Sequence, residues 1–194
     1  MNKQQIAQRL REWSSTRQAW DMRDEWTSVD MTGEEFAMID LRYANLRGAN
    51  FDGASLTGAD FTEANLRGAS FRGANLSGAT FSGANLRAAQ FVGADLEYAD
   101  FSRGISHIRR TNLIGAVFRE AFLAGVEMEG VDAIGTNFDG AVFFCTSGEC
   151  RGTSLRDSDF TGATFIGADL RNVDFSQAKT LDVDLSLAKI LPKP

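Results

Sequence analysis

A bulky apolar residue recurs every five positions through most of the chain, and this period limits the fold more than any other feature. The series runs from Met31 to Phe101, from Leu113 to Phe143 and from Leu155 to Ile190. We call this residue position 0 of each repeat. A period of five fits neither an α-helix, at 3.6 residues per turn, nor a plain strand, at two. It predicts a backbone that turns a corner once in each repeat.

Two flanking positions have residue preferences of their own. Position −2 is small, and it is Ala in every repeat from Ala44 to Ala99. Position +2 is mostly Gly, and of the 19 glycines only Gly104, Gly148 and Gly152 lie elsewhere. Because Gly reaches turn conformations that other residues avoid, it permits the corner. We therefore predict two inward residues per repeat, one small and one large, in coils that hydrogen-bond to their neighbours about 4.8 Å away.

The repeats resemble a known family. ANLRG at 44–48 and 64–68, and ADLEY at 94–98, are similar to the A-(D/N)-L-x-x motif of pentapeptide-repeat proteins, and the resemblance covers residues 29–190. It implies an all-β solenoid, a right-handed quadrilateral β-helix with four repeats per coil. Residues twenty apart would then stack. About thirty repeats would give about 7.5 coils and a rod about 36 Å long.

Two interruptions break the period, at 102–112 and 144–154. Each replaces a five-residue step by a twelve-residue step, from Phe101 to Leu113 and from Phe143 to Leu155. If the added residues loop outward, the columns of stacked apolar residues continue in register beyond them. We therefore predict two surface loops on one continuous solenoid, and no domain boundary at either place.

The two ends of the solenoid need protection, since an open coil exposes a strand edge and the core. Residues 1–28 are predicted to form a helical cap on the β-helix of 29–190, with helix over 2–26 and an apolar stripe of Ile6, Leu10, Trp13 and Trp20. A break at Ser14 and Ser15, and a helix that docks on a partner instead, stay open. At the other end, the prolines of ILPKP could block strand addition, or the end could form a homodimer; an apolar face is the alternative dimer contact.

Composition and sequence motifs argue against several classes of function. The net charge of −6 is spread evenly along the chain and disfavours direct nucleic-acid binding. The start lacks the apolar core of a secretion signal, and no stretch reaches the roughly 18 apolar residues of a membrane span, so a cytoplasmic location is expected. A single His, His107, offers no catalytic triad, and no phosphate-loop motif follows the glycines. We expect no enzyme and no cofactor.

The cysteines give no metal site by their spacing. Cys145 and Cys150 are separated by four residues, which is not a usual zinc spacing, and His107 belongs to the other interruption. Reduced thiols are expected, with a disulfide left open.

The candidate interaction residues fall in three groups. The first interruption carries Arg103, His107, Arg109 and Arg110, although a merely solvated loop is equally compatible with these residues. Stacking places Arg47, Arg67 and Arg87 in one outer column, beside Asn45, Asn65, Asn85 and Asn112, and that column turns apolar farther along. Phe122 and Val142 occupy a normally polar position, with Phe144 beside Val142, and coverage by the second interruption is the alternative to an exposed patch.

These features predict a non-enzymatic interaction or scaffold module that acts through the outer faces and loops of a rod. The resemblance implies a second possibility, because the quinolone-resistance branch of the family protects DNA gyrase, a type II topoisomerase, as an acidic, DNA-shaped dimer. Two features differ from that branch: no C-terminal dimerising helix is apparent, and the charge does not gather on one surface. A purely structural or self-assembling role is the third possibility.

Overall fold

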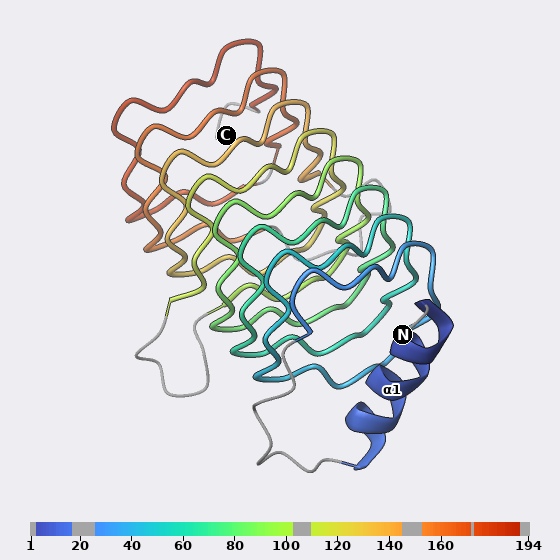
Figure 1. Cartoon of the computed structure of the whole chain (residues 1–194). Helices are drawn as coiled ribbons and strands as arrows, with labels where there is room; N and C mark the ends of the chain where they lie inside the picture. Colours follow the sequence, from blue (N-terminus) through green and yellow to red (C-terminus); the bar gives the residue numbers. More distant parts are fainter. Residues whose placement is uncertain (1–2, 17–25, 103–109, 145–152, 172, 191–194) are drawn as a thin grey trace.

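The chain forms a rod of stacked coils, with one α-helix across its N-terminal end (Figure 1). The computed structural model describes residues 3–16, 26–102, 110–144, 153–171 and 173–190, and of Trp13 only the backbone. The helix, α1, spans Lys3–Thr16. The coils lie parallel to one another along the rod, and the C-terminal coils are farthest from α1.

The register of the coils confirms four repeats per turn of the solenoid. Position −1 residues twenty apart form isolated parallel β-bridges, such as Asn45 with Asn65. Across the interruptions the separation becomes 27, as between Asn85 and Asn112, so each interruption adds seven residues without shifting the register. Among the described residues the bridges do not extend into longer strands, because the corner at position +2 bends the chain in every repeat.

The rod therefore has four sides, which we number in chain order by their position 0 residues. Side 1 contains Met31, Phe51, Phe71, Phe91, Phe118, Phe138, Phe165 and Leu185; side 2 contains Phe36, Leu56, Leu76, Leu96, Leu123, Phe143, Leu170 and Ile190. Side 3 contains Leu41, Phe61, Phe81, Phe101, Met128, Leu155 and Phe175; side 4 contains Trp26, Leu46, Leu66, Leu86, Leu113, Ala133, Phe160 and Thr180. Sides 1 and 3 face each other across the interior, as do sides 2 and 4.

Two stacks of phenylalanine rings fill the centre of the rod. On side 1 successive rings lie face to face, as at Phe71 and Phe91, whose centroids are 5.0 Å apart. Rings from side 3 meet them edge-on, as at Phe61 and Phe71 with an interplanar angle of 80°. Both arrangements are favourable for aromatic quadrupoles. Together with the alanines at position −2, these rings make the buried core that the repeat predicts.

The hydrogen bonds of the repeat explain why Asp and Asn are common at position −1. The backbone amides at positions −2, −1, 0 and +2 donate to other backbone carbonyls, whereas in the described ranges the amide at position +1 does not. The side chain at position −1 accepts that remaining hydrogen bond, as in Asp100 to Ser102 at 2.7 Å and Asp60 to Thr62 at 2.9 Å. An Asp or Asn here satisfies a donor that would otherwise depend on water.

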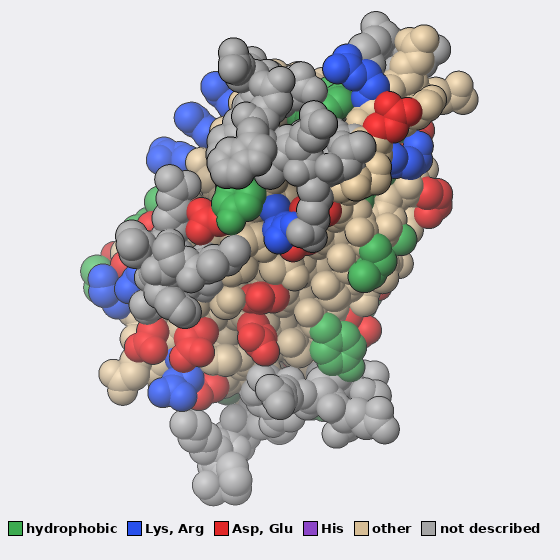
Figure 2. All heavy atoms as spheres, turned by 90° about the horizontal axis from the view of Figure 1, so that it is seen from below, with side chains coloured by type: hydrophobic (Ala, Val, Ile, Leu, Met, Phe, Trp, Pro, Cys, Tyr) green, Lys and Arg blue, Asp and Glu red, His purple; other side chains and the backbone are tan. Residues whose placement is uncertain are grey.

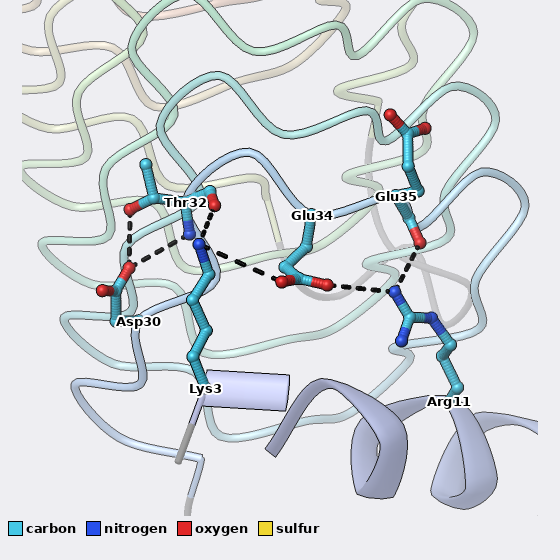
Figure 3. Close-up of polar contacts among 6 residues, drawn as sticks. All are labelled: Lys3, Arg11, Asp30, Thr32, Glu34 and Glu35. Atoms are coloured by element: carbon cyan, nitrogen blue, oxygen red, sulfur yellow. Dashed lines mark hydrogen bonds and ion pairs between the residues drawn. The ribbon is translucent and has the colours of Figure 1, made fainter. Parts of the chain in front are cut away.

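Helix α1 supplies hydrogen bonds that a preceding coil would make (Figure 3). The Arg11 guanidinium donates to the Glu35 carbonyl oxygen at 3.1 Å, and Lys3 Nζ donates to the Thr32 carbonyl oxygen. Ser14 Oγ accepts from the Asp40 amide at 2.8 Å. In later coils the equivalent groups bond to the coil before them, as the Asp60 amide does to the Ile39 carbonyl oxygen at 2.9 Å. The apolar side of α1, including the fully buried Leu10, packs on the same core.

The structure describes only part of the predicted N-terminal helix. Helix α1 spans Lys3–Thr16 and includes Ser14 and Ser15, whereas residues 17–25, with Trp20 of the predicted apolar stripe, lie outside the described residues. Trp26 is only 6% exposed and occupies a position 0, followed by Ser28 in the left-handed conformation at φ 54°. The Ser28 amide donates to the Arg47 carbonyl oxygen of the next coil at 2.8 Å. Trp26 and Ser28 therefore already follow the repeat of the solenoid, one repeat before Met31 and within the predicted cap of 1–28.

Candidate interaction surface

The two interruptions leave the rod at neighbouring corners. The first departs from side 3 after Ser102 and returns to side 4 at Thr111, and the second departs from side 2 after Phe144 and returns to side 3 at Thr153. Both loop roots therefore border side 3. Of the predicted loop residues, Arg103, His107, Arg109, Cys145 and Cys150 lie outside the described residues.

A buried threonine fastens the root of each loop. Thr111 Oγ1 donates to the Ser102 carbonyl oxygen at 2.7 Å and accepts from the Gly83 amide at 2.9 Å. Thr153 Oγ1 lies 3.4 Å from the carbonyl oxygens of Phe143 and Leu123. Sequence reasoning missed this role. The available signal was a Thr at position −2, where Ala is usual, directly after each interruption.

Side 3 is the acidic side of the rod. Its outward acidic residues are Asp40, Asp60, Glu63, Asp100, Glu127, Glu129, Asp157 and Asp174, and its described basic ones are Arg42 and Arg156. Figure 2 shows one face of the molecule, on which Asp and Glu side chains lie among Lys and Arg side chains. Side 3 carries more outward acidic residues than any other side among the described residues, although the other sides carry acidic residues as well. Sums over consecutive stretches of the sequence conceal this difference, because each coil contributes to all four sides.

Near α1, side 3 contains one paired cation. Arg42 Nη2 lies 2.6 Å from Asp40 Oδ2, and Arg42 Nε lies 3.5 Å from Asp60 Oδ2 on the next coil. The hydrogen bonds to Asp40 raise the pKa of the Arg42 guanidinium. The acidic column is thus partly neutralised at its first two coils, whereas Asp100 and Glu127 form no ion pair with a described residue.

The predicted patch of Phe122, Val142 and Phe144 is only partly exposed. Phe122 is 51% exposed on side 2, and Val142 beside it is half-buried. Phe144 is covered by the Arg171 guanidinium, which lies 3.8 Å from the ring centroid and is held by Asp169 at 2.6 Å. That hydrogen bonding lowers the pKa of Asp169. Phe122 is therefore the main exposed apolar side chain of the patch.

The predicted arginine column lies on side 4. The column of amides beside it is ordered, since Asn65 Nδ2 donates to Asn45 Oδ1 at 3.1 Å. Arg47, Arg67 and Arg87 are exposed, and no carboxylate of the described residues lies within 4.0 Å of them. Side 4 is opposite side 2, so the arginine column and Phe122 do not form a single site.

Arg110 returns from the first loop onto side 4. Together with Asn85, Asn112 and Asp132 it lines a shallow hollow of about 340 Å³. Burial, reinforced by the neighbouring Asp159, raises the pKa of the Asp132 carboxyl. Asp132 Oδ1 is buried and has no hydrogen-bond partner. The hollow is lined by one cation, Arg110, and one carboxylate, Asp132, and none of its other lining residues is titratable.

The described residues contain no cluster of three or more His, Cys, Asp or Glu side chains placed to hold a metal ion. In the same part of the chain, no helix has the length and apolar character needed to cross a membrane. At the far end of the rod the last coil exposes apolar side chains, with Leu185 at 42% and Ile190 at 55%.

Comparison with known proteins supports the fold. The sequence model for pentapeptide repeats matches residues 39–73, 69–104, 106–143 and 146–179. No curated protein matches the sequence.

Several solved structures are also similar to this chain. A trypsin-treated variant of QnrB1, a plasmid-mediated fluoroquinolone resistance protein, is 21% identical with a TM-score of 0.57, and the match covers 87% of this chain and 84% of the QnrB1 chain. HetL, a pentapeptide repeat protein involved in heterocyst differentiation regulation from the cyanobacterium Nostoc sp. strain PCC 7120, is 25% identical with a TM-score of 0.33, covering 84% and 87%. At 21% identity the likeness to the QnrB1 variant concerns the fold alone, a right-handed quadrilateral β-helix.

Proposed function

We propose, from the premise that this chain belongs to the pentapeptide-repeat family, that it is a non-enzymatic binding protein whose rod presents side chains to a protein partner. The fold itself leaves the function open, because function resides in surface sites. The contact region we assign is the part of side 2 around Phe122, next to the root of the second loop.

Phe122 is the observation that carries this proposal. It stands at position −1, where Asp or Asn normally caps the amide at position +1, and an aromatic ring cannot make that hydrogen bond. The ring is 51% exposed and forms a β-bridge to Val142, so two apolar residues follow each other in a polar column. The amide at position +1 therefore loses its side-chain acceptor, and apolar area is exposed instead. Exposed apolar area of this kind is typical of a contact surface.

Replacing Phe122 by Asn tests the site without damaging the fold. Asn restores the residue type of the neighbouring columns and can cap the Ala124 amide, so we expect thermal stability to be unchanged or slightly higher. Capture of protein partners from lysate of the native cell should be lost. Ile166→Ser is the matched control, because Ile166 is 38% exposed on side 1, and it should leave capture intact. Capture by Phe122→Asn equal to that of the unaltered protein would refute the assignment.

A second candidate is a modulator of DNA gyrase or another type II topoisomerase, and the acidic column on side 3 favours it. Position −1 of this side carries Asp40, Asp60, Asp100, Glu127 and Asp174, at about 4.8 Å per coil and interrupted by Thr80 and Ser154. A negative column of this kind could occupy a surface that binds DNA phosphates. The test is gyrase supercoiling with and without a quinolone. Asp100→Asn with Glu127→Gln should remove any effect, and added salt should weaken it. Supercoiling untouched by micromolar protein would eliminate this candidate.

The exposed terminal coil supports a homodimer as an additional partner. Leu185 and Ile190 occupy position 0 in columns that are otherwise buried, and an identical coil could cover them. Light scattering should report a dimer for the unaltered protein and a monomer for Leu185→Asp with Ile190→Asp. A monomer for the unaltered protein at all concentrations would contradict this contact.

A further inference from the structure

We propose that side 4 binds an amphipathic α-helix that lies along the rod, with its carboxylates on the arginine column and its apolar residues farther toward the C-terminal coils. This inference rests on the proposed function as a binding rod and adds the chemistry and shape of a partner. It concerns the side opposite Phe122.

No described residue neutralises the arginine column. Arg47, Arg67 and Arg87 occupy position +1 on three successive coils, about 4.8 Å apart at the backbone. No described carboxylate pairs with them, and Arg110 adds a further cation beside Asn85 and Asn112. Like charges stacked this closely repel each other unless an anion lies between them. Asp159, on the same side, is already engaged by Lys179 at 3.1 Å.

The same column becomes apolar after the first loop. Position +1 is then filled by Ile114, which is half-buried, and by Ile134, which is 39% exposed. Thr161, whose hydroxyl donates to Asp159 Oδ1 at 2.7 Å, comes next, and Leu181, near the end of the column, is 67% exposed. Position +1 of side 4 therefore changes along the rod from cationic to mainly apolar. A matching partner must carry acidic residues in one half of a single stripe and apolar residues in the other half.

The spacing of the coils selects the shape of that partner. From Arg47 to Leu181 the column is about 29 Å long at about 4.8 Å per coil, which corresponds to about 19 residues of α-helix at 1.5 Å per residue. Residues i, i+3 and i+7 of a helix span about 10.5 Å, close to the roughly 9.6 Å between Arg47 and Arg87. An extended strand places residues of one face about 6.8 Å apart and would lose register within three coils.

A nucleic acid fits this surface less well. Its phosphates could pair with the arginines, but the apolar side chains in the other half of the column cannot form ion pairs or hydrogen bonds with phosphates. The chain also carries a net charge of −6, which opposes accumulation of a polyanion. An acidic and apolar helix uses both halves of the column.

The probe is a synthetic, fluorescently labelled 20-residue peptide with Glu at three helix-spaced positions of its first half and Leu on the same stripe of its second half. Its affinity for the full-length protein is measured by anisotropy, and its helicity by circular dichroism. We expect saturable binding with a gain in helicity. A peptide of identical composition in scrambled order should bind at least about tenfold more weakly, because its stripe is lost.

Variants of the chain locate the binding site. Arg47→Gln, Arg67→Gln and Arg87→Gln together should weaken peptide binding by about tenfold or more. The matched control, Arg72→Gln, Arg119→Gln and Arg156→Gln, removes the same charge from exposed arginines of sides 1 and 3 and should leave affinity unchanged. Ile134→Ser should weaken binding without altering its salt dependence. Equal losses in both triple variants, equal binding of the scrambled peptide, or tighter binding of a single-stranded oligonucleotide would each overturn the proposal.

The two proposals fail separately. Phe122→Asn lies on the opposite side and should leave peptide affinity unchanged. If partner capture persists in Phe122→Asn but is lost in the side 4 triple variant, the side 2 site is wrong and side 4 stands. If the peptide does not bind while Phe122→Asn abolishes capture, the helix proposal is wrong and the side 2 site stands.

Discussion

Thr111 Oγ1 donates a hydrogen bond to the Ser102 carbonyl oxygen at 2.7 Å, which joins the first residue of the first loop to the point where the loop re-enters the rod. The hydroxyl is fully buried and also accepts from the Gly83 amide. It thereby provides hydrogen bonds to the Ser102 carbonyl oxygen and the Gly83 amide where the chain leaves the rod. The loop can vary while its root stays fixed, which is how a rigid solenoid presents an irregular segment.

Replacing Thr111 by Val should test this fastening. Val keeps the volume but removes the hydroxyl, leaving buried polar groups without a partner, so we expect a loss of about 1–3 kcal/mol in the free energy of unfolding. Thr111→Ser retains the hydroxyl and should lose less. Urea denaturation measures both. Equal stability of Thr111→Val and the unaltered protein would show that the hydrogen bond contributes nothing.

The carboxyl of Asp132 should make stability depend on pH in an unusual direction. Burial raises its pKa in the folded state, so its contribution to stability is present below the unfolded pKa and is lost as pH rises through the folded pKa. At neutral pH Asp132→Asn should therefore raise the melting temperature. The advantage over the unaltered protein should shrink as pH falls toward the range where Asp132 is protonated.

Asp159→Asn is the matched control for that experiment. The hydrogen bond from Thr161 lowers the pKa of Asp159, so its contribution is present above the unfolded pKa and is lost as pH falls through the folded pKa. Asp159→Asn should lower the melting temperature at neutral pH. Melting curves between pH 3 and pH 8 decide the matter. A fall in melting temperature for Asp132→Asn at neutral pH would contradict the structural account.

The ring stack predicts a large cost for removing one phenylalanine. Phe71 lies between Phe51 and Phe91 at 5.2 and 5.0 Å, and Phe71→Ala should cost about 3–5 kcal/mol. Ala74→Leu should cost about 1–3 kcal/mol, because the buried corner has no room for the larger side chain. Phe122→Ala, on the surface, should cost much less. Denaturant titration showing Phe71→Ala to be neutral would disprove the inward assignment.

At position +2, an Ala→Gly change should stabilise the protein and a Gly→Ala change should destabilise it. Ala88 and Gly68 occupy position +2 on adjacent coils of side 4, with φ of 58° and 68°. Ala88→Gly should stabilise the protein by up to about 1 kcal/mol, since Gly tolerates this conformation. Gly68→Ala should destabilise it by a similar amount, although no atom lies within 4 Å of the added Cβ. Thermal melts giving both changes the same sign would rule out a backbone effect.

Helix α1 should protect the first coil through specific hydrogen bonds as well as by covering apolar surface. Ser14→Ala leaves the Asp40 amide without its acceptor and should cost about 1 kcal/mol. Ser15→Ala is the control, since Ser15 bonds only within the helix, to the Glu12 carbonyl oxygen. Deletion of residues 1–25 should expose the first coil and promote association, measured by light scattering. A deletion variant that stays monomeric and melts unchanged would show that α1 does not serve as a cap.

The sequence alone determined the repeat geometry. A period of five with Gly at position +2 required a corner in each repeat, and all the described glycines at that position have positive φ. The resemblance to pentapeptide-repeat proteins implied four repeats per coil and therefore twenty-residue stacking. Given that number, the continuation of the stacking through two seven-residue insertions followed from the period, because register in a solenoid depends only on residue number. The inward positions were predictable for the same reason, although the last coil exposes Leu185 and Ile190.

Other features depended on contacts between distant residues. Arg171 covers Phe144 from the next coil, and α1 takes the place of a preceding coil through Arg11 and Ser14. That Trp26 belongs to the solenoid became apparent only from its burial. The acidity of side 3 is an intermediate case: it follows from twenty-residue stacking once the register is known, but sums along the chain conceal it. Local chemistry fixes the shape of a repeat, whereas only stacking decides which side chains of different coils meet.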